Sequence, residues 1–398
     1  MQQTDNTLAA SQRKPLPYGR QWIDEEDIAA VVEVLRGDWL TQGPTVAKFE
    51  LALADYCGAR FAVAVNSGTS ALHIAALAAG VKEGDTGITS PITFVASANC
   101  LAYCGATPKF ADINPRTVNI DPDALEAACR EHKPKVIVPI DFTGQPADLP
   151  EIYRIAKEYN AVVIEDAAHA LGATYAHDGV EFRAGSCAHA DMAILSFHPV
   201  KHVTTGEGGA VLTNDEDLYQ RLLELRTHGI TKDTGKMTRN DGPWYYEQQE
   251  LGFNYRITDF QCALGLSQMR KLDHFIEQRR KLVKLYENAL SDLRDDVRLL
   301  TETEGKKSSY HLLVAIISGG GKRRKRVFDY LQTQNIRAQI HYIPVHFQPW
   351  YQERFGFQRG DFPHAENYYE SCISLPLYPA MNEADVERVA MALRAALK

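Results

Sequence analysis

Short apolar runs that alternate with helical patterns are the feature that most constrains the fold of this chain. Seven such runs lie between residues 61 and 213, at 61–65, 88–90, 109–112, 136–140, 161–164, 192–195 and 210–213. Alternation of this kind predicts an α/β fold, a mostly parallel sheet with helices on both faces. In such sheets, reactive groups lie at the carboxyl ends of the strands. Functional residues are therefore expected where these runs end.

The pattern changes past residue 275. A long helix there is followed by a strand at 311–317, a helix near 326–334, a strand at 338–342 and a C-terminal helix at 382–398. We predict a large domain at 15–275, a smaller α+β domain at 276–398, and a disordered polar tail at 1–14. A chain of 398 residues that is 45% hydrophobic can build two cores of this size.

Composition excludes several classes of function. The formal net charge of -8 gives no global basic footprint for nucleic acid. The one basic run, at 322–326, leads into an apolar-periodic stretch and is predicted to be a solvated loop and helix start. No apolar stretch is long enough for a membrane span. Seven cysteines without paired or zinc-type spacing indicate reduced thiols and a cytoplasmic protein, with no metal site.

Lys201 follows the run at 192–195 and precedes a Gly-rich turn, within Ser-Phe-His-Pro-Val-Lys-His-Val-Thr-Thr-Gly-Glu-Gly-Gly at 196–209. A lysine removed from bulk water has a lowered pKa, which frees the amine as a nucleophile. Most lysines are solvated surface charges, so this residue alone does not establish catalysis.

The run at 61–65 leads directly into Asn-Ser-Gly-Thr-Ser-Ala-Leu at 66–72 and an Ala-rich helix. A strand followed by small polar residues and a helix N-terminus forms an anion site from backbone N–H groups, hydroxyls and the helix dipole. The alternative is an ordinary Ser/Thr helix cap. The stretch is neither a Walker loop nor GxGxxG, which disfavours an ATP or NAD enzyme.

The run at 161–164 ends in Glu165 and Asp166. A buried carboxylate needs a partner, here either an arginine elsewhere in the fold or a protonated ring nitrogen on a cofactor. Pyridoxal 5′-phosphate (PLP) fits the three features together, because it has a phosphate, a ring nitrogen and an aldehyde that reacts with an amine.

At this point the sequence resembles the DegT/DnrJ/StrS family of fold-type I, PLP-dependent nucleotide-sugar aminotransferases. The resemblance covers nearly the whole chain and rests on these stretches: Leu-Thr-Gln-Gly-Pro at 40–44, Asn-Ser-Gly-Thr-Ser-Ala-Leu at 66–72, Pro-Ile-Thr-Phe at 91–94, Ile-Glu-Asp-Ala-Ala-His-Ala-Leu-Gly at 164–172, Ser-Phe-His-Pro-Val-Lys at 196–201, Gly-Glu-Gly-Gly at 206–209, Gly-Phe-Asn-Tyr-Arg at 252–256 and His-Tyr-Ile-Pro-Val-His at 341–346.

The resemblance implies a role for each matching residue. Lys201 would bind the cofactor aldehyde covalently and then shuttle the proton to the sugar C4. Asp166 would pair with the ring nitrogen. The other implied cofactor contacts are phosphate binding by Ser67, Gly68, Thr69 and Ser196, stacking by Phe94, and contact of His169 with the phenolic oxygen, although many relatives carry Gln there. Asn254 would reach the phosphate of a neighbouring subunit, which implies a homodimer; its alternative role is that of a turn residue.

The resemblance is strongest to the branch that acts in pseudaminic acid biosynthesis. That branch implies amination of UDP-2-acetamido-2,6-dideoxy-β-L-arabino-hex-4-ulose at C4 with L-glutamate as donor. The implied sugar-nucleotide contacts are Tyr18, Leu40, Thr41, Gln42, Gly43, His341, Tyr342, Ile343, Pro344 and Tyr351. For Tyr351 the alternative is a surface aromatic residue in a loop.

Alternative functions remain at this stage. A related enzyme could aminate a different keto sugar, such as the D-xylo epimer or a dTDP- or GDP-linked sugar. A PLP-dependent sugar dehydratase of the same fold is disfavoured by Lys201, which such relatives lack. A non-catalytic PLP-fold regulator would not need the lysine.

Overall fold

The computed structural model describes residues 14–398, so the predicted disordered tail lies outside the described residues except for Lys14. The central sheet has seven strands in the order β2-β10-β9-β6-β5-β3-β4, and β10 runs antiparallel to both of its neighbours. The α/β class and the mostly parallel sheet are therefore confirmed. The strands are β2 (Phe61–Val65), β3 (Thr86–Thr89), β4 (Thr107–Phe110), β5 (Val136–Val138), β6 (Val162–Asp166), β9 (Met192–Ser196) and β10 (Gly209–Thr213).

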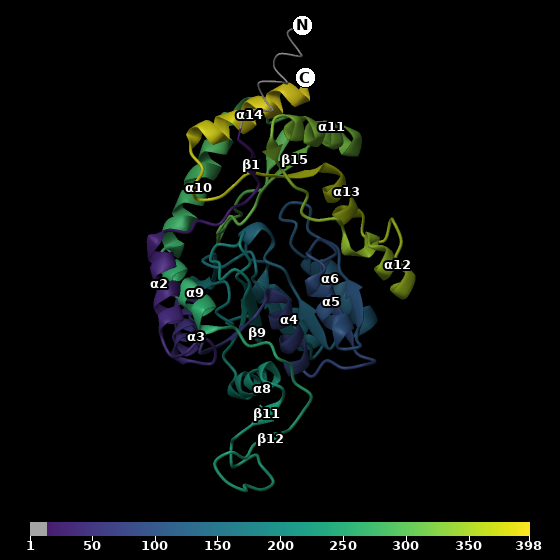
Figure 1. The fold of residues 1–398 in the computed structure, drawn as a ribbon. Coiled ribbons are helices and arrows are strands. Elements are labelled where there is room, and N and C mark those ends of the chain that lie inside the picture. The colour runs from purple at the N-terminus through teal and green to yellow at the C-terminus, as the bar shows by residue number, and fades with distance from the viewer. Residues whose placement is uncertain (1–13) are drawn as a thin grey trace.

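Helices cover both faces of this sheet (Figure 1). One face packs against α4 (Gly68–Ala78), α5 (Ala96–Tyr103) and α8 (Glu216–Arg226), through alternate strand residues such as Val63, Ile164 and Ile194. The opposite face packs against α3 (Pro44–Cys57), α6 (Pro122–His132), α7 (Leu149–Glu158) and α9 (Asp259–Met269). Helix α2 (Glu25–Arg36) lies outside α9 and begins at a capping box formed by Asp24 and Asp27.

A second core lies in the C-terminal part. The antiparallel strands β13 (Val297–Leu299), β15 (Leu313–Ile317) and β17 (Cys372–Leu375) pack with α10 (Leu272–Ala289), α11 (Gly320–Thr333) and α14 (Glu383–Leu397). The predicted boundary at 275/276 falls within α10, which contributes Phe275 to the contacts near Trp22 and Tyr286 to the C-terminal core. Leu16, in β1 (Leu16–Pro17), also belongs to that core, because β1 pairs with β16 (Ile336–Arg337). The division into two domains stays a prediction.

Several elements differ from the sequence-based expectation. The strand predicted at 338–342 is wrong, because regular pairing stops at Arg337 and Gln339 makes only an isolated bridge to Ser374. The elements that the sequence analysis did not identify include the strands β13 and β17, the β7 (Thr174–His177) and β8 (Val180–Arg183) hairpin, β14 (Lys306–Lys307), α12 (Pro349–Phe355), α13 (Pro363–Ser371), the short strands β11 (Ile230–Thr231) and β12 (Glu247–Gln248), and the 3-10 turns at Phe142–Gly144, Ser291–Leu293 and Val345–Phe347.

No helix within residues 14–398 combines the length and the apolar character needed to cross a bilayer.

Candidate functional site

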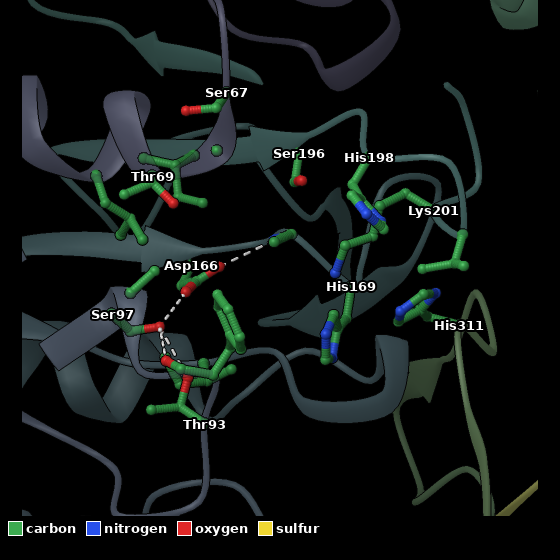
Figure 2. A pocket seen from close by; sticks show the side chains of 18 of the residues that line it. Ser67, Thr69, Thr93, Ser97, Asp166, His169, Ser196, His198, Lys201 and His311 are labelled. Carbon is green, nitrogen blue, oxygen red and sulfur yellow. Dashed lines mark hydrogen bonds between the residues drawn. The ribbon is translucent and has the colours of Figure 1, made fainter. Parts of the chain in front are cut away.

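A cavity of about 480 Å³ opens at the carboxyl ends of β6 and β9, beside the N-terminus of α4 (Figure 2). It brings together eight of the nine residues assigned to the cofactor and three of those assigned to the sugar nucleotide. These eleven residues are Ser67, Gly68, Thr69, Phe94, Asp166, His169, Ser196, Lys201, Tyr18, His341 and Tyr342. Their assigned roles remain predictions, but their placement in one cavity supports them.

The predicted anion site lies at the first turn of α4. Ser67 is the helix N-cap and its hydroxyl accepts a hydrogen bond from the Ser70 N–H at 3.1 Å. The N–H groups in the first turn of a helix have no partner within the helix. Apart from that of Ser70, the N–H groups of this turn therefore remain available to an anion. A Cβ at Gly68 would lie 2.9 Å from the Ser196 Cβ, so only glycine allows the turn to approach β9 this closely. Both the helix cap and the anion site are therefore compatible with this stretch.

Asp166 is almost completely buried at the end of β6. Its Oδ2 accepts a hydrogen bond from the Ser97 hydroxyl at 2.6 Å, and its Oδ1 accepts one from the Ala168 N–H at 3.2 Å. Burial raises the pKa of Asp166, while these hydrogen bonds and Lys201 oppose that shift. No arginine lines the cavity in the described chain, which favours a cation supplied by a bound group as the partner of this carboxylate.

Lys201 lies in the turn between β9 and β10, and its side chain extends into the cavity toward His169 (Figure 2). Its backbone N–H donates to the His198 carbonyl at 2.9 Å, which fixes the start of the turn. Burial lowers the pKa of Lys201 to about 8, although the nearby Asp166 acts in the opposite direction. At neutral pH, a useful fraction of this amine is therefore unprotonated and nucleophilic.

Neutral imidazoles surround the lysine. The centroid of the His169 ring lies 4.4 Å from that of His311, and His169 Nε2 is 3.1 Å from the Tyr342 hydroxyl. Burial lowers the pKa of His169 and His311 well below the usual value, and the Lys201 charge adds to this effect. The Nδ1 atom of His169 is buried without a hydrogen-bond partner in the described chain. A polar group of a bound ligand would satisfy it.

The remaining predicted contacts lie elsewhere. Asn254 is exposed, and the loop at 40–43 lies near it: Gln42 and Gly43 line a separate cavity with Arg226 and Arg256. Residues Ile343 and Pro344 do not line the main cavity.

Tyr351 is only 2% exposed, and its hydroxyl donates to Asn99 Oδ1 at 2.6 Å. The expectation of a surface residue in a loop is wrong for Tyr351, because α12 packs its ring into a small apolar cluster.

Sequence analysis missed several cavity residues, among them Thr93, Ser97, His198, Glu207 and His311. The hydroxyls of Thr93 and Ser97 are 2.8 Å apart, but Thr93 precedes α5, so helical spacing alone does not predict this contact. His311 comes from the C-terminal part of the chain, and no local pattern places it beside His169.

The cavity fits PLP in its own geometry. The glycine-dependent turn of α4 forms a cradle for a phosphate, and the buried Asp166 suits a protonated ring nitrogen. The unpaired Nδ1 of His169 and the low-pKa Lys201 lie on the side where a hydroxyl and an aldehyde would be held. No group of His, Cys, Asp and Glu suited to a metal ion occurs in residues 14–398.

Comparisons with known sequences agree with this chemistry. The model of the DegT/DnrJ/EryC1/StrS aminotransferase family matches residues 21–394. The spore coat polysaccharide biosynthesis protein SpsC of Bacillus subtilis is 39% identical over 386 residues, covering 96% of this chain and 97% of SpsC. A UDP-4-amino-4,6-dideoxy-N-acetyl-beta-L-altrosamine transaminase of Campylobacter jejuni is 37% identical over 377 residues, covering 94% of this chain and 95% of that protein.

Two solved structures have the same fold. Helicobacter pylori PseC, an aminotransferase involved in the biosynthesis of pseudoaminic acid, superimposes with a TM-score of 0.87 at 32% identity, over 96% of this chain and 99% of PseC. Spr1654 of Streptococcus pneumoniae, solved in its PLP form, gives a TM-score of 0.88 at 28% identity, over 96% of this chain and 99% of that one.

Proposed function

This chain belongs to the DegT/DnrJ/EryC1/StrS aminotransferase family of PLP-dependent sugar aminotransferases, and we propose that it transfers the amino group of L-glutamate to C4 of UDP-2-acetamido-2,6-dideoxy-β-L-arabino-hex-4-ulose. The reaction would serve pseudaminic acid biosynthesis. The observation that carries this proposal is the cavity itself, in which Lys201, Asp166 and the first turn of α4 meet. The names of the Campylobacter jejuni and Helicobacter pylori relatives support the choice of sugar.

PLP supplies an electron sink that stabilises negative charge at the carbon losing its proton. The residues of the chain bind, orient and move protons. In the proposal, the turn at Ser67, Gly68 and Thr69 binds the phosphate. Asp166, oriented by Ser97, holds the proton on the ring nitrogen. Lys201 would hold the aldehyde, and its Nζ would take up and deliver the proton.

The cavity-lining residues Phe94 and Tyr342 give the bound ring an aromatic wall, since their rings lie 6.2 Å apart. Tyr18 and His341, whose ring centroids are 5.0 Å apart, line the same cavity and are proposed to contact the sugar. Asn254 is proposed to reach the phosphate of a second subunit, so the active form would be a homodimer. A cytoplasmic location belongs to the same proposal and is supported by seven free cysteines.

A product assay tests the substrate. The purified protein with PLP and L-glutamate is offered the L-arabino and D-xylo epimers of the UDP-linked 4-keto-6-deoxy-N-acetylhexosamine in parallel. Products are identified by mass and by NMR coupling constants. Amination of the L-arabino epimer alone is the expected result. Preference for the D-xylo epimer would overturn the choice of sugar but retain the role of Lys201.

Amination of a different nucleotide sugar is the second candidate, and one observation favours it. SpsC, whose name refers to spore coat polysaccharide, is as similar over the full length as the transaminase relatives are. Turnover of dTDP- or GDP-linked keto sugars, but of neither UDP-linked epimer, would support this alternative. A non-catalytic regulator would fail a simpler test, in which L-glutamate bleaches the absorbance of the bound cofactor.

A further inference from the structure

Two buried carboxyl groups lie beneath the cavity without lining it. Asp141 follows β5 and Glu165 lies in β6, and both side chains are essentially inaccessible to solvent. Successive residues of a strand point to opposite faces. Glu165 therefore points away from the cavity that Asp166 faces. The roles proposed above use neither Asp141 nor Glu165.

Backbone donors hold both carboxyl groups in place. The Gly185 N–H donates to Glu165 at 3.0 Å to Oε1 and 3.2 Å to Oε2, and the Ala147 N–H donates to Asp141 Oδ1 at 2.8 Å. The two carboxyl groups lie at the ends of neighbouring strands, close enough for one to donate to the other when it carries a proton. Two carboxylates are acceptors only, so a bond between them requires a proton on one of them. Asp141 Oδ2 is buried without a hydrogen-bond partner in the described chain, so it is free to accept that proton.

The surroundings disfavour two negative charges. Burial raises the pKa of Asp141 and of Glu165, and the nearby Asp141 charge raises that of Glu165 further. Lys306 acts on Asp141 in the opposite direction, but burial lowers the pKa of Lys306 itself. The other titratable groups around the pair, or around its neighbours, are Asp166, Asp148, Tyr175, Cys57, Cys187 and Arg183.

The backbone links this pair directly to the cavity. The Asp141 N–H donates to the Asp166 carbonyl at 3.1 Å, and the Asp166 N–H donates to the Pro139 carbonyl at 2.8 Å. The ends of β5 and β6 are therefore joined at the residue that faces the cavity. A shift of Asp141 or Glu165 would move the Asp166 carboxylate with it.

We propose that Asp141 and Glu165 share one proton, and that this proton makes them a positioning pair that holds Asp166 in place from the opposite face of the sheet. Glu165 donates its O–H to Asp141 Oδ2, and Asp141 stays ionised. Loss of the proton leaves two adjacent buried carboxylates, whose repulsion separates the strand ends. The link to cofactor binding rests on the proposed role of Asp166, whereas the shared proton is testable in the apoprotein.

The sign of the pH dependence follows from linkage. The folded-state pKa of Glu165 lies above its unfolded value. Between these two pKa values, the folded protein therefore binds more protons than the unfolded protein does. The pair stabilises the fold fully below that pH and loses this contribution as pH rises through the folded-state pKa. Glu165→Gln keeps the geometry without a titrating proton, because its amide can donate to Asp141 and its oxygen can accept from Gly185.

The first experiment is isotope-edited infrared spectroscopy of the apoprotein. We expect the carbonyl band of a protonated carboxyl group at neutral pH in the natural protein, and its loss in both Glu165→Gln and Asp141→Asn. Asp148→Asn, which removes an exposed carboxylate near Lys306, is the matched control and should keep the band. Absence of the band from the natural protein at neutral pH would overturn the shared proton, whatever the substrate.

The second experiment tests positioning through PLP affinity. Above the pKa of the pair, the Kd of the natural apoprotein should rise by up to about tenfold per pH unit relative to that of Glu165→Gln, as expected for one linked proton. Asp148→Asn should follow the natural protein. Parallel profiles for the natural protein and Glu165→Gln, with the infrared band present, would make the pair purely structural and refute its role in positioning Asp166.

Discussion

The cavity at the carboxyl edge of the central sheet and the surface around Asn254 differ in how completely one chain builds them. In the cavity, Asp166 is buried with two donors and Lys201 is surrounded by neutral imidazoles. Asn254 is exposed, and its carbonyl accepts only a long 3.5 Å bond from the Asn66 side chain. The difference fits the proposal that one subunit provides the residues of the cavity, whereas Asn254 acts on a second copy of the chain.

Lys201→Ala gives the sharpest test of the cavity. We expect turnover to fall by at least about 10³-fold, because the variant loses both the covalent attachment of PLP and the proton carrier. Steady-state kinetics and the absorbance of bound PLP measure the two effects. The exposed Lys82→Ala serves as a control and should keep both. Substantial turnover by the Lys201 variant would place the chemistry elsewhere.

Asn254→Ala tests the other surface. We expect turnover to fall about 10²-fold. The variant should stay folded, because the residue is exposed and its contacts with Asn66 and Thr227 are made by the backbone, which alanine retains. If Asn254 acts across a symmetric dimer, mixing and reassembling the Lys201 and Asn254 variants should restore about a quarter of the natural activity. Random reassembly makes half of the dimers mixed, and each mixed dimer has one site of its two with both Lys201 and Asn254 intact. No recovery, despite confirmed subunit exchange, would confine Asn254 to its own subunit.

The pH dependence of cofactor capture tests the electrostatics of the cavity. Only the neutral Lys201 amine reacts, so the rate of PLP attachment to the apoprotein should rise about tenfold per pH unit below its pKa and level off near pH 8. Borohydride trapping at timed intervals measures this rate. A rate that continues to rise toward pH 10 would show that the lysine has the pKa of a solvated residue.

Gly68→Ala tests the close approach of α4 to β9. The added Cβ would meet the Ser196 Cβ at 2.9 Å, so the turn must move away from the phosphate position. We expect the PLP Kd to rise about tenfold. The unfolding free energy should change by less than about 1 kcal/mol, because alanine also favours the helix. Gly37→Ala, at the end of α2, would place its Cβ at ordinary contact distances of 3.4 and 3.7 Å from two backbone carbonyl oxygens and is the matched control. An unchanged Kd would separate this turn from the phosphate.

Tyr351→Phe has the smallest expected effect and addresses a predicted substrate contact. The variant removes the bond to Asn99, which should cost about 1 kcal/mol of unfolding free energy in chemical denaturation. If Tyr351 is structural, KM for the nucleotide sugar should change less than twofold. A large rise in KM at unchanged stability would instead restore the predicted sugar contact.

The sequence identified the residues at strand ends because their positions follow from local pattern. Asp166 ends one apolar run and Lys201 lies in the turn that follows another, and the parallel sheet brings the ends of these two strands to one edge. The sequence did not place His311 beside His169, because that contact joins segments 142 residues apart. It also gave no basis for separating Tyr351 from the cavity. A tyrosine near predicted ligand residues looks alike in sequence whether its hydroxyl meets a sugar or Asn99.

Helix α10 has a practical consequence for dissecting this protein. One end of the helix packs near Trp22 and the other in the C-terminal core, and β1 near the start of the chain completes that same core. A fragment ending at residue 275 would cut the helix and leave β1 without its partner strand. Fragments 14–290 and 291–398 expressed together should reassemble more readily than fragments cut at 275, because the first pair leaves α10 whole.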